Sequence, residues 1–527
     1  MFLILSSAYI DQALKAEFGL LPPTMLPLGN RRLFQHQIAA IPEGICTYIS
    51  LPESYILTIH DTELLQHQNI NFIKIPDNIS LGAALVTALN IIDQPLSQSL
   101  HVLFGDTLIL TLPDGEDIAA ISEVEDSYNW AAVTDNEVNW LETNESISLS
   151  NSKNVVCGYF KFSQPKKLIK AITQSHWDFI EGLNYYHRDV GLTSVRISNW
   201  LDFGHVNTYY RSKAKFTTQR AFNNLTITAN YIEKSSCKEE KIKAEAYWFT
   251  TVPETIRCFL PQYLGVIESN GKFCYRLEYL YYSALNELFV FSCLPTMAWK
   301  RIISSCLDFI DICLQFSAPE SASAPLLNEL FCEKTKYRLN EFCQTNQFSI
   351  SQEWNYNDSF TISLQDLLEK STQHLPRANL QQTIMHGDFC FSNILYDFRT
   401  GRIKTIDPRG LTPRGILTIY GDVRYDLAKL SHSVLGMYDW IIADYYAVEI
   451  IGNCIYFNIA GIEEHLSTHE IFIDMIENRY GITANNLYAM QIQLFLSMLP
   501  LHADSAKRQA ALMANAFRLY QKLVGSA

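Results

Sequence analysis

A loop-rich stretch in the last third of the chain carries the residue types that phosphoryl transfer requires. Residues 384–410 read IMHGDFCFSNILYDFRTGRIKTIDPRG, in which Asp388 and Asn393 are five positions apart and Asp407 follows a turn centred on residues 399–401. ATP carries negative charge on the oxygens that an attacking hydroxyl must approach. An aspartate can accept the hydroxyl proton, while an amide and a second carboxylate can hold Mg²⁺. The spacing therefore predicts a phosphoryl-transfer site.

The motifs HGDFCFSNIL and IDPRG resemble the signature of the aminoglycoside phosphotransferase and choline kinase family. The resemblance implies that Asp388 is the catalytic base, that Asn393 and Asp407 bind Mg²⁺, and that His386 braces the loop. It also implies that ATP is the phosphoryl donor. The alternative is an Asx-rich turn around a buried histidine.

The small lobe of this family supplies a lysine and a glutamate, and candidates for both precede the loop. Lys234 ends the strand-like segment YIEK, and Glu245 follows eleven residues later in the helical pattern KIKAEAYWF. By resemblance, Lys234 contacts the ATP phosphates and Glu245 orients it, although either residue could be a solvated surface charge. The strand LEYL, residues 277–280, resembles the hinge whose backbone binds adenine. Glu278 and Leu280 are therefore candidate cofactor-binding residues, whereas no glycine-rich phosphate loop is visible before Lys234.

Charged residues also follow Asp407. The segment GDVRYDLA, residues 421–428, resembles one that the family commonly has at this point. We expect Asp426 to cap or brace the catalytic loop. Arg409 and Arg414 either hold an anionic substrate near the transferred phosphoryl group or are plain surface residues.

The first 210 residues resemble the sugar-phosphate nucleotidyltransferases, which join an NTP to a sugar or alcohol phosphate. Four segments carry the likeness: PPTMLPLGNRRLFQHQI (22–38), SLGAAL (80–85), FGDTLI (104–109) and NWLDFGHVNTYY (199–210). The resemblance implies that Gly82 lies in a nucleotide-binding turn and that Asp106 and Asp202 converge on one Mg²⁺. Taken alone, an aspartate at the end of a strand is usually a turn residue.

This half lacks two features of the nucleotidyltransferase family. The family's phosphate loop uses glycines and a basic side chain to hold the NTP, whereas this chain reads SSAYIDQALKAEFG, with no glycine before Gly19. Thr24 replaces the family's lysine, and nearby positive charge comes from Lys15, Arg31 and Arg32. The N-terminal domain is therefore either an active transferase that binds a second NTP, or a degenerate module. A degenerate module would bind a nucleotide or glycan precursor and regulate the kinase.

The apolar patterns predict two domains, in keeping with a length of 527 residues. Alternating strand-like and helical segments over residues 1–212 predict an α/β domain with a mainly parallel sheet and helices on both faces. Residues 220–527 are expected to form an α+β bilobal, protein-kinase-like domain, with a small lobe to about residue 282 and a large helical lobe from there on. The apolar stretch 441–462 predicts a core helix rather than a membrane span.

Composition argues against several classes of partner and location. The formal charge is -14, so a nucleic-acid backbone would be repelled overall. The 12 cysteines form neither a disulfide framework nor a zinc pattern, which favours a reducing cytoplasm. The first residues, MFLILSSAYIDQ, are typical of a buried strand and not of a signal peptide. No membrane span is expected.

Together these patterns predict ATP-dependent phosphorylation of a small sugar or alcohol, coupled to NTP activation of the product for capsule or other surface-polysaccharide synthesis. The alternative is a kinase alone, with a regulatory first domain. A scaffold of two inactive folds is disfavoured because Lys234, Glu245, Asp388, Asn393 and Asp407 are all present. The many aromatic residues of the helical half predict core packing, or else a cage for a choline-like cation.

Overall fold

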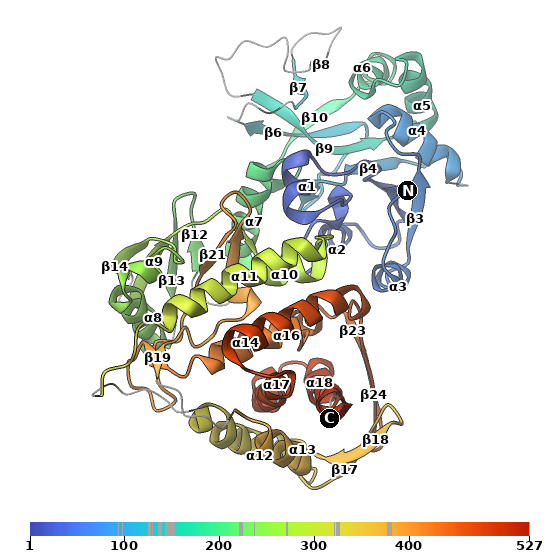
Figure 1. Cartoon of the computed structure of the whole chain (residues 1–527). Coiled ribbons are helices and arrows are strands. Elements are labelled where there is room, and N and C mark those ends of the chain that lie inside the picture. Colours follow the sequence, from blue (N-terminus) through green and yellow to red (C-terminus); the bar gives the residue numbers. More distant parts are fainter. Residues whose placement is uncertain are drawn as a thin grey trace. The chain divides into compact units, whose positions relative to one another are not determined.

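The computed structural model describes residues 1–92, 94–96, 98–124, 128, 130–134, 140–142, 153–220, 225–236, 238–269, 272–320, 322, 327–376 and 382–525. The chain forms two compact units, Met1–Lys213 with Phe291–Cys293, and Ala214–Val290 with Leu294–Ala527. Figure 1 labels their elements. The expected domain limits at residues 212 and 220 both fall within one helix, α7 (Val206–Arg220).

The first unit contains a mixed sheet. Its strand order is β10-β6-β9-β4-β1-β2-β3; β1 runs parallel to β2 and β4, β2 to β3, and β6 to β10, whereas β9 is antiparallel to β4 and β6. The unit's elements are β1 (Phe2–Leu5), α1 (Gln12–Phe18), α2 (Leu33–Ala39), β2 (Thr47–Pro52), α3 (Ile59–His67), β3 (Ile70–Ile75), α4 (Leu81–Ile91), β4 (Leu100–Phe104), β5 (Thr107–Ile109), β6 (Ile118–Val124), β7 (Ala132–Val133), β8 (Leu141–Glu142), β9 (Lys153–Phe162), α5 (Pro165–Gln174), α6 (Phe179–Asp189), β10 (Thr193–Arg196), β11 (Trp200–Asp202) and α7.

The central strand β1 shows why the sequence folds this way. A parallel strand in the middle of a sheet is covered on both faces, so apolar residues are needed at every position, and all of FLIL is buried. Leu3 and Leu5 belong to the core that also contains residues of α4, α5 and α6. Because side chains alternate along a strand, Phe2 and Ile4 point to the opposite face. The predicted α/β class with a mainly parallel sheet is confirmed.

The second unit begins with a small antiparallel lobe. Its sheet has the order β12-β13-β15-β14, and helix α8 packs on β15. The buried face of α8 contributes Ile242, Trp248 and Phe249 to the core, with Glu245 buried among them. The elements of this lobe are β12 (Leu225–Ile227), β13 (Tyr231–Ser235), α8 (Glu239–Thr251), α9 (Glu254–Arg257), β14 (Tyr263–Ser269) and β15 (Lys272–Glu278).

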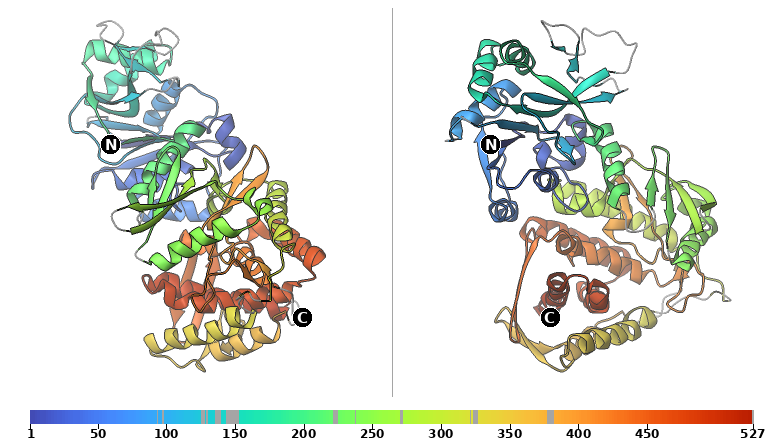
Figure 2. Two further views of the ribbon diagram at one scale, coloured as in Figure 1. Left: turned by 90° about the vertical axis from the view of Figure 1, so that its left-hand side faces the viewer. Right: turned by 180° about the vertical axis from the view of Figure 1, so that it is seen from behind.

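The rest of the second unit is mainly helical. Helix α17 is buried along most of its length and packs against α12, α13, α14 and α18. The right-hand view of Figure 2 looks along the two dark red helices, α17 and α18. The elements are β16 (Ser283–Ala284), α10 (Leu285–Phe291), α11 (Thr296–Cys313), a π-helical turn (Glu329–Glu333), α12 (Lys334–Thr345), β17 (Glu353–Tyr356), β18 (Phe360–Ser363), α13 (Leu364–Gln373), β19 (Thr383–Ile384), β20 (Ile394–Asp397), β21 (Arg402–Thr405), β22 (Tyr420–Gly421), α14 (Arg424–Val434), α15 (Tyr438–Ile442), β23 (Tyr446–Ile451), β24 (Cys454–Ile459), α16 (Leu466–Tyr480), α17 (Ala484–Met498) and α18 (Ala506–Gly525). Short 3-10 turns occur at Pro23–Met25, Phe391–Asn393, Glu463–His465 and Leu499–His502.

The expectation of a core helix at 441–462 is wrong. This stretch forms the antiparallel strands β23 and β24, joined at Gly452, whose φ of 58° suits a tight turn. Burial alternates along β24, with Ile455, Phe457 and Ile459 buried, which is the period of a strand. Short apolar runs rich in β-branched and aromatic residues fit a helix or a strand equally well. Here the turn at Gly452 allows the two runs to pair as strands. None of the helices within the described ranges has the length and apolar character needed to cross a bilayer.

Candidate active sites

The loop between β19 and β20 brings Asp388 and Asn393 into contact. The Asn393 Nδ2 donates to the backbone carbonyl of Asp388 at 2.9 Å and to its carboxylate at 3.1 Å. Because the amide nitrogen is used in this way, the amide oxygen remains for a cation, and amide oxygens are suitable Mg²⁺ ligands. The Ile406 N–H donates to the Asn393 carbonyl at 3.0 Å, which holds the residue before Asp407 beside Asn393.

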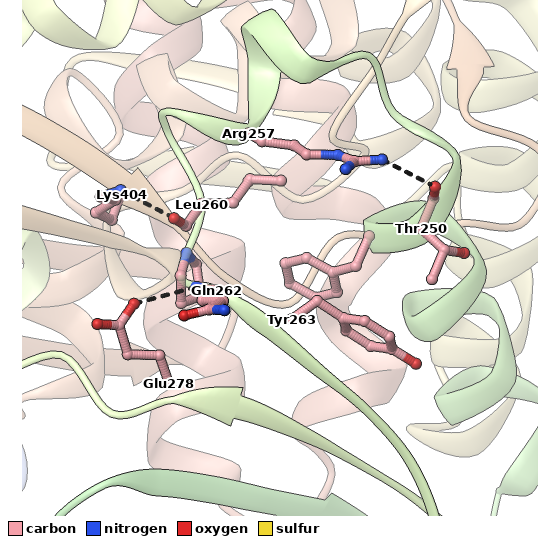
Figure 3. Close-up of a pocket in the computed structure, with 9 residues that line it drawn as sticks. Thr250, Arg257, Leu260, Gln262, Tyr263, Glu278 and Lys404 are labelled. Carbon is pink, nitrogen blue, oxygen red and sulfur yellow. Dashed lines mark hydrogen bonds between the residues drawn. The ribbon is translucent and has the colours of Figure 1, made fainter.

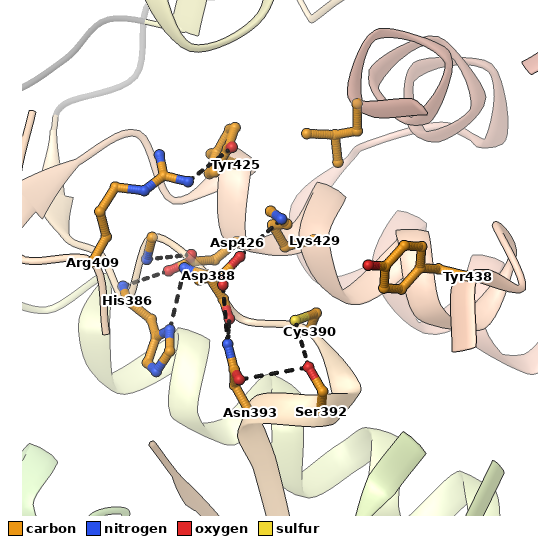
Figure 4. A network of polar contacts seen from close by, with 12 residues as sticks. His386, Asp388, Cys390, Ser392, Asn393, Arg409, Tyr425, Asp426, Lys429 and Tyr438 are labelled. Atoms are coloured by element: carbon orange, nitrogen blue, oxygen red, sulfur yellow. Dashed lines mark hydrogen bonds and ion pairs between the residues drawn. The ribbon is translucent and has the colours of Figure 1, made fainter. Parts of the chain in front are cut away.

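A buried carboxylate fixes the start of this loop. Asp426, on α14, accepts the N–H of His386 at 2.7 Å and that of Gly387 at 2.8 Å (Figure 4). Burial raises the pKa of Asp426 to about 7, against the effect of these two N–H groups. The His386 ring is fully buried, lies edge-on to Trp248, and accepts the Asp388 N–H through Nδ1 at 3.3 Å. Acceptance through Nδ1 requires a neutral ring with the proton on Nε2.

His386 gives the fold a pH dependence. Burial lowers its pKa to about 4, whereas an unfolded histidine titrates near about 6.5. Between pH 7 and pH 5 the His386 ring is therefore protonated in the unfolded chain but not in the folded chain. This group should lower the free energy of unfolding by about 2 kcal/mol over that range. His386→Asn keeps an acceptor for the Asp388 N–H but does not titrate. We expect this variant to lose about 2 kcal/mol less stability than the wild type between pH 7 and pH 5, as measured by denaturant titration. An equal loss in both proteins would contradict the burial of a neutral ring.

Lys234 joins three segments of the second unit. Its ammonium lies 2.7 Å from a carboxylate oxygen of Glu245 and 2.7 Å from one of Asp407. Glu245 is fully buried and also accepts the Tyr275 hydroxyl at 2.7 Å. Although burial opposes the charge on Lys234, the Asp407 and Glu245 carboxylates raise its pKa. Burial, together with Asp407, raises the pKa of Glu245 in spite of Lys234.

The close packing of α8 on the segment after Asp407 depends on a glycine. Gly410 has a φ of 63°, and a Cβ there would lie 2.1 Å from the Ala244 carbonyl oxygen. Gly415 has a φ of 82° and nothing within 4 Å of its Cβ position, so it carries the same backbone penalty without the contact. We expect Gly410→Ala to lower the free energy of unfolding by about 2–3 kcal/mol more than Gly415→Ala does, as measured by denaturant titration. Equal losses would contradict the packing.

Lys429 is a site residue that the sequence reasoning missed. Its ammonium lies 2.8 Å from Asp388, whose side chain is 38% exposed. Although burial favours the neutral acid, the Lys429 and Arg409 cations hold the pKa of Asp388 below its usual range. Asp388 is therefore ionised at neutral pH. Lys429 follows Asp426 by three residues and so shares its helical face, which is the sequence signal that could have indicated it.

The predicted hinge residues lie at the end of β15. The N–H of Glu278 donates to the Gln262 carbonyl at 2.9 Å, and its side chain accepts the Gln262 N–H at 3.2 Å. The Leu280 N–H has no hydrogen-bond partner among the described residues, so it is the free donor of this segment. A cavity of about 540 Å³ is lined by Glu278, Tyr263 and Lys404, among other residues, and Figure 3 draws these side chains. Lys234, Glu245, Asp407 and Leu280 do not line this cavity.

In the first unit, Asp106 and Asp202 come together through the pairing of β5 with β11, in which Asp202 is opposite Thr107. A Cβ on Gly204 would lie 2.7 Å from the Asp106 carboxylate and 3.4 Å from that of Asp202, so both face this glycine. Burial, and then the Asp202 charge, raise the pKa of Asp106 to about 7. One buried carboxylate oxygen of Asp202 has no hydrogen-bond partner.

These features of Asp106 and Asp202 fit a divalent cation, which would relieve their repulsion. Among the described residues, no group of three or more His, Cys, Asp or Glu side chains is arranged to hold a metal ion. A cation here would take its other ligands from water or substrate.

Other features of the first unit are less suited to a triphosphate. The Asp11 carboxylate accepts the Leu14 N–H at 2.8 Å and so occupies the N-terminus of α1 with negative charge. Thr24 is fully buried and donates to Gln37 at 2.7 Å. Arg32 is also buried and pairs with Asp61 at 3.3 Å. Of the nearby cations, only Lys15 and Arg31 are exposed.

Gly82 contacts the unit's own backbone. It lies in the first turn of α4, and a Cβ there would be 2.5 Å from the Trp177 carbonyl oxygen. The Ser80 hydroxyl donates to the same oxygen at 2.9 Å. The space beside Gly82 is therefore filled by the connection between α5 and α6, and its predicted contact with nucleotide remains a prediction.

Known structures of two classes match different parts of the chain. No family model matches it, and no curated protein matches it. The first class includes a sugar pyrophosphorylase and a CTP transferase, and the second includes an aminoglycoside and a macrolide phosphotransferase. The sequence motifs of the two halves resemble the same two classes.

Three structures illustrate these similarities. A nucleoside-diphosphate-sugar pyrophosphorylase from Vibrio cholerae RC9 is 13% identical, and the match covers 40% of this chain and 99% of that one with a TM-score of 0.34. The inositol-1-phosphate CTP transferase from T. maritima is 13% identical, with 42% and 97% covered and a TM-score of 0.31. A macrolide 2'-phosphotransferase from Brachybacterium faecium is 11% identical, with 54% and 84% covered and a TM-score of 0.30.

Proposed function

We propose that the second unit is an ATP-dependent kinase that phosphorylates a hydroxyl group of a small sugar or alcohol. The observation that carries the proposal is the contact of Lys234 with both Glu245 and Asp407, at 2.7 Å each. Kinase sites need a lysine for the ATP phosphates, a glutamate to orient it and an aspartate for Mg²⁺. The Asp388–Asn393 contact adds the base and the second metal ligand of such a site.

In the proposed reaction the acceptor hydroxyl oxygen forms a bond to the γ-phosphorus of ATP, and the bond from that phosphorus to the β,γ-bridging oxygen breaks. Asp388 takes the hydroxyl proton, and ADP leaves with the bonding electron pair. Lys234 binds the phosphates, while Asn393 and Asp407 would hold Mg²⁺, which neutralises phosphate charge when bound. His386 is a positioning residue that orients the loop through the Asp388 N–H. In this proposal the Leu280 N–H donates to adenine at the end of the hinge strand.

Metal removal tests this function directly. We expect the full-length chain to release ADP from ATP when Mg²⁺ and a small hydroxyl compound from a panel of sugars and alcohols are both present. Because Mg²⁺ neutralises the phosphates, excess EDTA should stop the release, and restored Mg²⁺ should recover it. ADP release that persists in EDTA would contradict the proposed site.

For the first unit, we propose NTP-dependent nucleotidyl transfer to the phosphorylated product. The shared face of Asp106 and Asp202 supports a metal-assisted reaction, since one buried oxygen of Asp202 makes no hydrogen bond among the described residues and has only His205, 4.0 Å away, beside it. A kinase makes the phosphate ester that such a transferase consumes, so joining the two keeps the intermediate local. The product belongs to the class of activated donors that capsule or other surface-polysaccharide synthesis uses. We also infer a reducing cytoplasm as the location, where ATP is supplied and free thiols persist.

A specific observation favours a second function for this unit. The Asp11 carboxylate at the N-terminus of α1 and the buried Thr24 leave little positive charge for a triphosphate. In this alternative the unit binds a nucleotide or glycan precursor and regulates the kinase. Pyrophosphate release from each NTP in the presence of sugar phosphates distinguishes the two. Release that is lost in Asp106→Ala supports transfer, whereas NTP binding without release supports regulation.

A further inference from the structure

Three cationic side chains gather around one buried tyrosine beside Asp388. The Tyr425 hydroxyl, on α14, accepts hydrogen bonds from Lys334 Nζ at 3.3 Å and from Arg409 Nη2 at 3.1 Å. Lys429 lies one turn further along α14 and pairs with Asp388 at 2.8 Å. We call Lys334, Arg409 and Lys429, together with Tyr425, the cationic cluster. It draws on α12, on the segment after Asp407 and on α14.

The cationic cluster carries more positive than negative charge. Within the described ranges Asp388 is the one carboxylate that forms an ion pair with it, and Lys334 and Arg409 have no ion pair. Burial, and then the neighbouring Arg409 and Lys429, lower the pKa of Lys334 to about 8. Against the effect of burial, Arg409 and Lys334 lower the pKa of Tyr425 to about 7. Mutual repulsion of this kind is relieved when an anion binds.

The cationic cluster is continuous with the proposed base. The Arg409 N–H donates to the His386 carbonyl at 2.8 Å, and a Cβ on Gly387 would lie 2.7 Å from Arg409 Cβ, so Arg409 packs directly on the loop that carries Asp388. In Figure 4, Arg409 and Lys429 flank Asp388, on its left and on its right. An acceptor whose hydroxyl reaches Asp388 would therefore present its other substituents to these cations.

We propose that the acceptor of the kinase carries an anionic group, a carboxylate or a phosphate ester, that binds Lys334 and Arg409 while its hydroxyl approaches Asp388. This inference rests on the proposed kinase function and names the substrate class of that same site. Arginine and lysine together bind either anion through charge-assisted hydrogen bonds. In the transfer step Asp388 takes the hydroxyl proton, the new oxygen–phosphorus bond forms and ADP departs, so the anionic group stays unchanged and serves only for binding.

The same cluster disfavours a choline-like acceptor. A quaternary ammonium would be repelled by Lys334, Arg409 and Lys429, and a cage needs exposed ring faces. Five of the six aromatic residues that could have formed a cage are instead packed in the core of the second unit, and the sixth, Tyr438, is half-buried with its ring 4.2 Å from that of His432. Those buried are Trp354, Tyr356, Trp440, Tyr445 and Tyr446.

Binding of matched three-carbon compounds to the full-length chain tests the inference. Glycerate supplies a carboxylate, glycerol 3-phosphate a phosphate ester, and glycerol neither. At constant ionic strength and with saturating MgADP, we expect at least one of the two anions to raise the unfolding temperature, and glycerol not to. Affinity for the binding anion should fall about ten- to hundredfold in Lys334→Gln and in Arg409→Gln. Stabilisation by neither anion, or by glycerol alike, would overturn the inference.

The control is Arg414→Gln, since Arg414 is 75% exposed and its ion pair within the described residues, at 3.6 Å, is with Glu329 and not with a member of the cluster. We expect Arg414→Gln to retain the anion-dependent stabilisation. Equal losses in Arg414→Gln and Arg409→Gln would reduce the effect to general surface charge and overturn the inference. The two proposals fail separately, because absence of MgADP binding contradicts the kinase itself. MgADP binding without any anion effect contradicts only the anionic acceptor.

Discussion

Asp388→Asn is expected to lower the rate of ATP-dependent phosphorylation by about 10²–10⁴-fold while leaving MgATP affinity nearly unchanged. An amide cannot accept the hydroxyl proton, whereas asparagine has the size of aspartate and keeps an oxygen for the Asn393 Nδ2 at the position now 3.1 Å away. Lys429 is only 13% exposed and loses its carboxylate partner in this variant, so some loss of stability is expected as well. The measurement is ADP release at saturating MgATP and acceptor, with the unfolding temperature recorded in parallel.

A neighbouring aspartate provides the control. Asp397 lies in the turn between β20 and β21 and accepts the Arg399 N–H at 2.9 Å and the Thr400 hydroxyl at 2.8 Å. Asp397→Asn should cost about 1 kcal/mol of stability and keep the phosphorylation rate. Undiminished turnover in Asp388→Asn would show that Asp388 is not the base.

Lys234→Met is expected to have two separable effects. Removal of the ammonium leaves the buried Glu245 with only the exposed Lys241, 3.7 Å away, as a cation, which should lower the free energy of unfolding by about 3 kcal/mol. It also removes the proposed phosphate contact, so turnover should fall by about 10²–10³-fold. Denaturant titration measures the first effect, and ADP release measures the second.

The double variant Lys234→Met, Glu245→Gln separates these effects. A neutral amide at position 245 no longer needs a buried cation and can still accept the Tyr275 hydroxyl, so most of the lost stability should return. Turnover should stay low, because the lysine is still absent. Recovery of turnover together with stability would mean that Lys234 acts only on the fold and does not contact ATP.

The sequence allowed a prediction of those contacts that local spacing determines. Asp388 and Asn393 are five residues apart in one loop, and they are in contact. The family resemblance implied the contact of Lys234 with Glu245, eleven residues further along the chain, and this pair is in contact as well. The Lys234–Asp407 contact spans 173 residues, and only the family resemblance could indicate it. The mainly parallel sheet was likewise predictable, because strands such as FLIL are apolar at every position.

The sequence was less informative where tertiary packing decides. Lys429 reaches Asp388 because α14 packs against the loop, and its spacing of three residues from Asp426 is the one local signal of that contact. Lys334 has no such local signal, since its proximity to Arg409 depends on the packing of α12. The stretch 441–462 predicts a helix because an apolar run without its partner strand fits either a helix or a strand. The pairing of β24 with β17 and β23 makes it part of a sheet.

Calorimetric titration of the full-length chain with MgATP tests the central claim most directly, because it needs no knowledge of the acceptor. We predict one saturable site with a dissociation constant below about 1 mM, the usual upper range for enzyme substrates. The heat should be lost in Lys234→Met, which removes the proposed phosphate contact, and kept in Asp397→Asn, which lies outside the site. Absence of saturable MgATP binding, or binding that Lys234→Met leaves unchanged, would contradict the assignment of the second unit as a kinase.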